Sequence, residues 1–165
     1  MLIEISEIEK QILDCDGSCR DINIEDVSFE YANEIAVFLS EVYALKSAVN
    51  SEGEDVVSSI RNGNLQRQFD IKPNSIHAVY ENESALIANM QVYWAWGNEG
   101  DVYVEFTFFP EDVANEFSFS SFEHFVQPLI RASGSSIYFV RYENASWKFG
   151  DTSPEGGVIY QGKIG

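Results

Sequence analysis

The chain has 165 residues, of which 45% are hydrophobic and 14% aromatic, enough for one folded domain with a sizeable core. Its 10 Lys and Arg stand against 27 Asp and Glu, which gives a net charge of −17. Such a surface repels the phosphates of nucleic acids and the anionic headgroups of membranes, so we expect neither as a partner. The charge favours an electropositive protein partner, although solubility alone also accounts for an acidic surface.

The beginning of the chain carries no sign of export. Its first 13 residues alternate apolar with charged residues and lack the basic segment and apolar run of a signal peptide. No stretch approaches the roughly 20 apolar residues of a membrane span. We therefore expect a cytoplasmic protein with a single globular domain over residues 1–165.

Residues 3–24 predict a β-hairpin. Asp16-Gly17 is a strong hairpin turn signal, and residues 19–24 alternate apolar with polar residues beyond it. Cys15 and Cys19 flank this turn. A reducing cytoplasm predicts free thiols for both, and a bridge across the turn is the alternative.

A helix is predicted after Ser28, because apolar residues then recur at helical spacing. Its expected buried stripe consists of Tyr31, Ile35, Phe38, Leu39, Val42, Leu45 and Val49. Glu30, Glu34 and Glu41 lie off that stripe and should face water. Residues 50–55 form an acidic connection, and residues 56–72 allow a short helix before Pro73.

A β-meander should follow, with short polar connections at 82–84 and 97–100. The expected strands are residues 75–81, 85–96 and 101–109.

The second main helix should begin near Ser120, where Glu123 completes a capping-box pattern, and end at Gly134. Pro128 conflicts with its interior, since proline removes a backbone donor. The expected final strands are residues 136–142, 146–149 and 157–161. Together these elements predict an α+β fold: a largely antiparallel sheet of about six to eight strands with two main helices packed on one face.

Catalytic and metal-binding motifs are absent from the sequence. It contains no phosphate-binding loop, dinucleotide fingerprint, nucleophile elbow or His-Glu-x-x-His motif. His77 and His124 have no metal-like spacing to each other or to the cysteines. Asp and Glu are so frequent that a pair at catalytic distance would carry no weight. We therefore expect no enzyme activity, no metal and no cofactor.

Acidic and aromatic residues are the candidate partner contacts. The acidic candidates fall in three connections: Asp14, Asp16 and Asp21; Glu52, Glu54 and Asp55; and Glu99 and Asp101. Trp94 and Trp96 share one face of a predicted strand, where they fill the core or form an exposed protein-binding patch.

Two segments carry a resemblance to a known class of proteins. Residues 16–23 (DGSCRDIN) and 138–151 (YFVRYENASWKFGD) resemble stretches of small bacterial immunity proteins from polymorphic toxin and contact-dependent growth-inhibition systems. The resemblance implies a cytoplasmic inhibitor that binds one cognate toxin, many of which are nucleases with basic clefts.

Other classes of function remain as alternatives to an immunity protein. One is an acidic nucleic-acid mimic that inhibits a restriction or CRISPR nuclease, which would need carboxylates spaced like duplex phosphates. Others are an enzyme with an unrecognised site and a structural subunit of an assembly. Both a monomer and a homodimer formed through a sheet edge fit the sequence.

Overall fold

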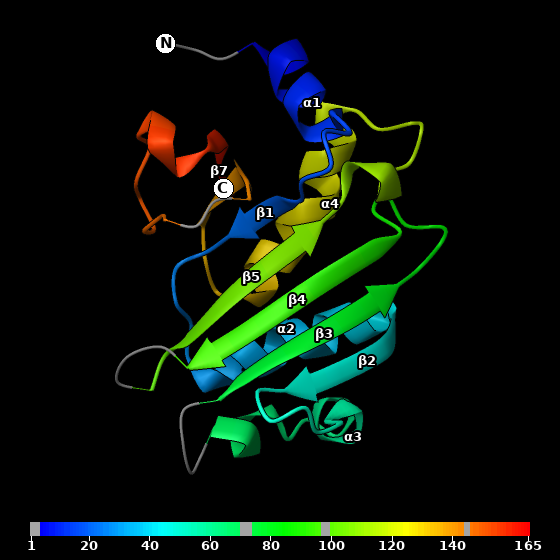
Figure 1. Cartoon of the computed structure of the whole chain (residues 1–165), viewed down its shortest axis with the longest axis vertical. Helices are drawn as coiled ribbons and strands as arrows, with labels where there is room; N and C mark the ends of the chain where they lie inside the picture. The colour runs from blue at the N-terminus through cyan, green and yellow to red at the C-terminus, as the bar shows by residue number, and fades with distance from the viewer. Residues whose placement is uncertain (1–3, 70–73, 97–99, 144–145) are drawn as a thin grey trace.

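The computed structural model describes residues 4–69, 74–96, 100–143 and 146–165. Its described strands form one antiparallel sheet in the order β2-β3-β4-β5-β1-β6-β7 (Figure 1). The strands are β1 Arg20–Asn23, β2 Ala44–Asn50, β3 Ser75–Glu81, β4 Asn89–Trp96, β5 Val102–Phe108, β6 Ile137–Tyr142 and β7 Val158–Lys163. The fold is α+β and its sheet is antiparallel, as the sequence predicts.

The two longest helices lie behind the sheet in Figure 1 and cover the same face of it, as predicted. The helices are α1 Ile5–Leu13, α2 Phe29–Val42, α3 Val57–Arg61 and α4 Phe119–Ala132, with the 3-10 turns η1 Leu65–Phe69, η2 Pro110–Asp112 and η3 Pro154–Gly156. Within the described ranges, no α-helix lies over the opposite face, which we call the open face. None of these helices is long and apolar enough to cross a membrane.

The core lies between the sheet and helices α2 and α4. Successive side chains of a strand point to opposite faces, so alternate residues of β3, β4 and β5 are buried. Ile76, Trp94 and Phe106, on three neighbouring strands, are each 0% exposed and meet Ile35 of α2 in the same core. The residues that alternate with the buried ones along each of these strands point to the open face.

The predicted N-terminal hairpin is wrong, because the chain forms helix α1 there and then strand β1. Ile8 and Ile12 are about one helical turn apart and both are buried, so the helical conformation is stabilised by the burial of its apolar face. The buried guanidinium of Arg20 donates from Nε to the Gln11 carbonyl at 2.9 Å and from Nη2 to the Asp14 carbonyl at 2.8 Å. It thereby satisfies carbonyl groups at the C-terminal end of α1.

Helix α2 is shorter than its predicted stripe. It ends at Val42, and Leu45 and Val49 belong to β2, where pairing with β3 replaces helical hydrogen bonds. Tyr43 at the junction is buried and donates its hydroxyl to the Ile87 carbonyl at 2.8 Å. Tyr31 is 45% exposed and therefore lies outside the buried stripe. The three predicted water-facing residues are exposed as expected: Glu30, Glu34 and Glu41.

Helix α4 has a different cap from the predicted one. Ser118 accepts a hydrogen bond from the Ser121 backbone, and Ser121 accepts one from the Ser118 backbone, so the box lies two residues earlier than Ser120 and Glu123. Glu9 of α1 also accepts a hydrogen bond from the Phe119 backbone at 3.0 Å. The helix continues through Pro128 and ends before Gly134, whose φ is 72°.

Two predicted strands also differ. Strand β4 begins at Asn89 rather than Ala85, because residues 82–88 first form a turn closed by the Asn82 side chain, which accepts from the Ser84 backbone. Residues 146–149 form no strand. Trp147 instead lies against Phe139 and Arg141 of β6, which holds the segment by side-chain contacts.

Candidate functional site

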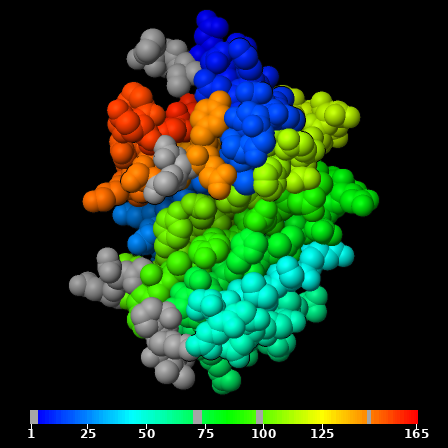
Figure 2. Space-filling view, viewed as in Figure 1, coloured from blue at the N-terminus to red at the C-terminus, as the bar shows by residue number. Residues whose placement is uncertain are grey.

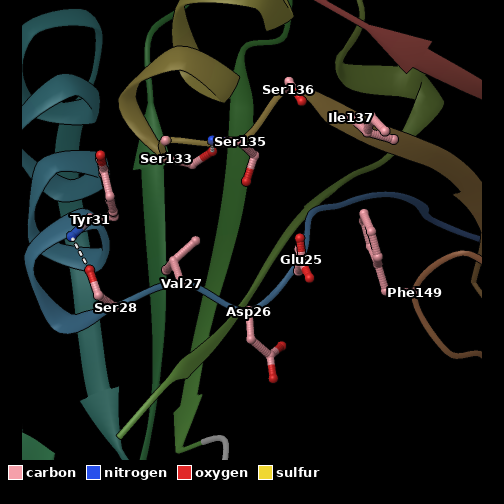
Figure 3. Close-up of a pocket in the computed structure, with 11 residues that line it drawn as sticks. Glu25, Asp26, Val27, Ser28, Tyr31, Ser133, Ser135, Ser136, Ile137 and Phe149 are labelled. Atoms are coloured by element: carbon pink, nitrogen blue, oxygen red, sulfur yellow. Dashed lines mark hydrogen bonds between the residues drawn. The ribbon is translucent and has the colours of Figure 1, made fainter.

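A groove of acidic and aromatic residues lies at the end of the sheet where β1 ends and β5 begins. It consists of two adjoining pockets of about 370 and 600 Å³, which share Glu25, Asp26 and Phe149. We call it the strand-end groove. Figure 3 shows the first pocket, with Tyr31 of α2 on one side, Phe149 on the other, and Glu25 and Asp26 between them.

The local sequence explains why two acidic side chains reach this groove. Ile24 and Val27 are 1% and 5% exposed and anchor the segment after β1 in the core. Val27 also exchanges both backbone hydrogen bonds with Val102, at 2.9 and 2.6 Å. Glu25 and Asp26 lie between these anchors and are exposed.

Negative charge accumulates in the groove. The pKa of Asp26 is raised, first by partial burial and then by the nearby carboxylates of Asp101 and Glu25. Lys148 is the one basic residue among the described residues that line the two pockets. The groove is therefore suited to a positively charged group.

Exposed aromatic rings flank these acids. Tyr31 is 45% and Phe149 37% exposed. Trp147 is fixed by a hydrogen bond from its Nε1 to the Asp151 carbonyl at 2.8 Å. Its ring also packs edge-on against that of Phe149, with 6.1 Å between the ring centres. Rigid aromatic rings beside charged groups are the composition of protein-binding hot spots.

A hydrogen-bonded polar cluster lies on the open face next to the groove. Arg141 donates from Nε to Asn23 at 2.9 Å, and its Nη2 lies 3.6 Å from the Asp21 carboxylate. Tyr103 donates its hydroxyl to Glu105, and Asn23 donates to both of them at 3.0 Å. We call these five residues, together with Thr107, the open-face cluster. Because Tyr103 also lines the strand-end groove, the two features are continuous.

Asp21 belongs to this cluster and is only 4% exposed. Burial, and then the neighbouring Glu105, raise its pKa to about 7, against the opposing effects of Thr107 and Arg141. Its predicted role as a surface contact is therefore wrong. The strand alternation that brought it to the open face also placed it beneath Arg141.

The other acidic candidates separate to two ends of the sheet. Asp101 lies in the strand-end groove. Glu52, Glu54 and Asp55 lie at the same end, in the connection after β2. Asp14 and Asp16 lie at the opposite end, between α1 and β1 (Figure 1). Glu99 falls outside the described residues.

The two tryptophan candidates have different environments. Trp94 is 0% exposed within the core, so its predicted partner contact is wrong, since the ring does not reach the surface. Trp96, at the end of β4, is 36% exposed and pairs with Val102 beside Asp101. Sequence reasoning missed Glu25, Asp26 and Phe149; the only signal was an acidic pair enclosed by Ile24 and Val27.

The cysteines and histidines have structural surroundings. Cys15 is exposed, Cys19 is buried, and both are free thiols. His77 Nε2 hydrogen-bonds Gln91 at 2.8 Å, and His124 Nδ1 lies 2.8 Å from the Ser120 carbonyl. Within the described ranges, no group of three or more His, Cys, Asp or Glu side chains is placed to hold a metal ion.

Comparison with known proteins supports the fold. No family model matches the chain, and no curated protein matches it. One chain of a 1.75 Å crystal structure of the toxic C-terminal tip of CdiA from Pseudomonas aeruginosa, in complex with immune protein, matches with a TM-score of 0.58 at 12% identity. The match covers 90% of this chain and 97% of that chain. The protein therefore shares its α+β fold with a chain of a toxin–immune protein complex.

Proposed function

We propose that the protein is an immunity protein that binds and neutralises a cognate bacterial toxin domain. The observation that carries the proposal is the fold match, which spans nearly the whole length of both chains. The resemblance of residues 16–23 and 138–151 to immunity proteins supports the same reading from the sequence.

The matched crystal structure contains a toxic tip and an immune protein, and we assign this chain to the protective role. Its net charge of −17 suits an inhibitor of a protein with a basic surface, and opposes direct action on nucleic acid. We infer that it acts by binding rather than by catalysis, in the cytoplasm of the cell that makes it.

We further propose that the toxin is electropositive and meets the strand-end groove. Glu25, Asp26 and Asp101 provide the charge, and Tyr31 and Phe149 provide exposed aromatic area. A nuclease with a basic substrate cleft fits this chemistry, because the carboxylates would stand where phosphates bind.

Growth protection tests the proposal directly. The C-terminal domain of a large protein encoded directly upstream of this chain is expressed in a bacterial host, with and without the chain. We expect the domain to stop growth alone, the chain to restore it, and the two purified proteins to form a one-to-one complex. The chain expressed alone should leave growth unaffected.

Two results would count against the proposal. If the toxic domain still stops growth and forms no complex with the chain, the protective role is wrong. If the chain expressed alone stops growth, its assignment within the toxin–immune pair must be reversed. Tight binding to a restriction or CRISPR nuclease instead would favour nucleic-acid mimicry.

A further inference from the structure

The open face presents a row of side chains that crosses the sheet. Cross-strand pairing aligns Val49, His77, Tyr93 and Glu105 on β2, β3, β4 and β5. Val49 and Tyr93 are each 41% exposed. Figure 2 shows this face from the front, with the green surface of β3, β4 and β5 running across its middle.

A pocket of about 160 Å³ opens in the middle of this row. The Tyr93 ring lies 5.9 Å from the His77 ring, and His77 hydrogen-bonds Gln91 at 2.8 Å, so these three side chains support one another. Glu105 and Thr107 of β5 complete the pocket. Its volume suits a single side-chain head group rather than an extended ligand.

Glu105 offers this pocket an oxygen with spare hydrogen-bonding capacity. Its Oε2 accepts the Tyr103 hydroxyl and the Asn23 amide. Its Oε1 has, among the described residues, only the Thr107 hydroxyl at 3.5 Å. That hydroxyl has one proton and lies closer to Asp21, at 2.9 Å, so Oε1 remains available to another donor.

The charges around the pocket are unbalanced. Glu105 has no ion pair with a lysine or arginine among the described residues, because the guanidinium of the cluster, that of Arg141, lies beside Asp21 at 3.6 Å. Arg141 also donates to Asn23 and to the Gly156 carbonyl, so it is committed to several acceptors. The described residues that line the pocket include no lysine or arginine. An incoming cation would therefore balance this charge and supply the donor that Oε1 lacks.

We propose that this pocket is the socket for one arginine or lysine side chain of the toxin, an inference that rests on the proposed function. The cationic head group donates to Glu105 Oε1 and lies against the Tyr93 ring, where a cation is attracted by the aromatic face. The toxin then covers the open face as well as the strand-end groove, which Tyr103 joins to the socket.

The chemistry of the pocket argues against other occupants. An anion would face the Glu105 carboxylate, with no lysine or arginine among the described lining side chains. A divalent metal ion prefers several oxygen ligands, and the described residues offer no such group of acids here. An apolar side chain would leave the Glu105 oxygen desolvated without a donor, which is costly.

A small cation tests the socket without the toxin. Arginine amide is titrated into the isotopically labelled protein at constant ionic strength, and the NMR signals of His77, Gln91 and Tyr93 are followed. Citrulline amide, of similar shape but without the guanidinium charge, is the matched ligand control. We expect saturable shifts with a Kd of about 1 to 10 mM for arginine amide, as befits so small a ligand.

Two variants test which groups carry the binding. Glu105→Gln should weaken arginine amide binding about fivefold or more, because the amide lacks the charge. Since Glu105 also accepts bonds from Tyr103 and Asn23, Tyr93→Ala is the second variant, outside that network. Glu41→Gln, on the exposed side of α2, removes the same charge elsewhere and should leave binding unchanged.

The proposal is overturned if citrulline amide shifts the same signals equally, or if neither Glu105→Gln nor Tyr93→Ala weakens binding. In the toxin complex, the same two variants should each raise Kd about tenfold while Glu41→Gln does not. If the wild-type chain binds arginine amide but no toxin, the proposed function fails and the socket stands. If it binds toxin and both variants bind equally well, the socket fails and the function stands.

Discussion

The Arg141 guanidinium lies 3.6 Å from the Asp21 carboxylate across neighbouring strands of the open face, and both side chains are nearly buried. The same guanidinium lies 4.4 Å from the centre of the Trp147 ring. Arg141 thus joins the open-face cluster to the segment that lines the strand-end groove. A substitution of Arg141 would therefore disturb both the open-face cluster and the segment that lines the groove.

Asp21 should make stability depend on pH. Its pKa rises from 3.8 to about 7 on folding, mainly through burial, so the folded state holds a proton that the unfolded state has lost. The stabilisation is complete below about pH 4 and disappears as pH rises through about 7. At about 1.4 kcal/mol per pH unit, the difference amounts to about 4 kcal/mol.

Urea unfolding of the wild type and Asp21→Asn at several pH values measures this effect. The wild type should lose about 4 kcal/mol of unfolding free energy between about pH 4 and about pH 8 that the variant keeps, because the amide of the variant does not titrate. Glu41→Gln, on the exposed side of α2, is the control and should follow the wild-type profile over this window. Parallel profiles for Asp21→Asn and the wild type would contradict the assignment.

Trp94 and Trp96 should differ in how much each contributes to the free energy of unfolding. Trp94→Ala removes a fully buried ring and should cost about 3–5 kcal/mol of unfolding free energy. Trp96→Ala, at a 36% exposed position, should cost less than about 1 kcal/mol. Chemical denaturation of both variants provides the comparison, and equal losses would show that exposure does not distinguish them.

Charge reversal in the strand-end groove should weaken the toxin complex. Asp26→Lys and Asp101→Lys each place a cation opposite a basic partner and should raise Kd about tenfold at low salt. The loss should shrink at high salt, because exposed charges are screened. Titration calorimetry at two ionic strengths measures both effects.

Glu41→Lys is the matched control for these reversals, since it changes the net charge equally on the outer side of α2. Its affinity should stay close to that of the wild type. If it weakened binding as much as Asp101→Lys, total charge rather than the groove would govern the association.

The two thiols should react separately. Cys15 is exposed, whereas Cys19 is buried, and burial raises the Cys19 pKa to about 11. Because the thiolate is the reactive form, a thiol reagent near neutral pH should modify Cys15 first and Cys19 only after unfolding. Mass spectrometry of the native and denatured protein counts the modified residues; two rapid modifications in the native state would contradict this order.

Local signals in the sequence were sufficient for much of the fold. Alternation predicted β3 at Ser75–Glu81, and helical spacing ended by Gly134 predicted α4. These signals suffice because the side-chain period and the turn residues act over a few positions. The antiparallel sheet with two main helices on one face followed from their order.

Long-range contacts decided the rest. Strand β1 lies between β5 and β6, more than 80 residues away along the chain, so nothing near Asp21 in the sequence signals that Glu105 and Arg141 will surround it. Trp94 and Trp96 are two residues apart and therefore lie on the same face of β4. Only Trp94 lies beneath the helices, because Trp96 is at the end of its strand.

The sequence by itself determined the charge, the fold class and most element types, since these depend on composition and short-range periodicity. Only the tertiary structure decided where the charge acts. It gathered Glu25, Asp26 and Asp101 with Phe149 in one groove, and it placed Glu105 at a pocket beside Tyr93. Both sites join residues distant along the chain, and pairing of distant strands creates proximity that no local pattern encodes.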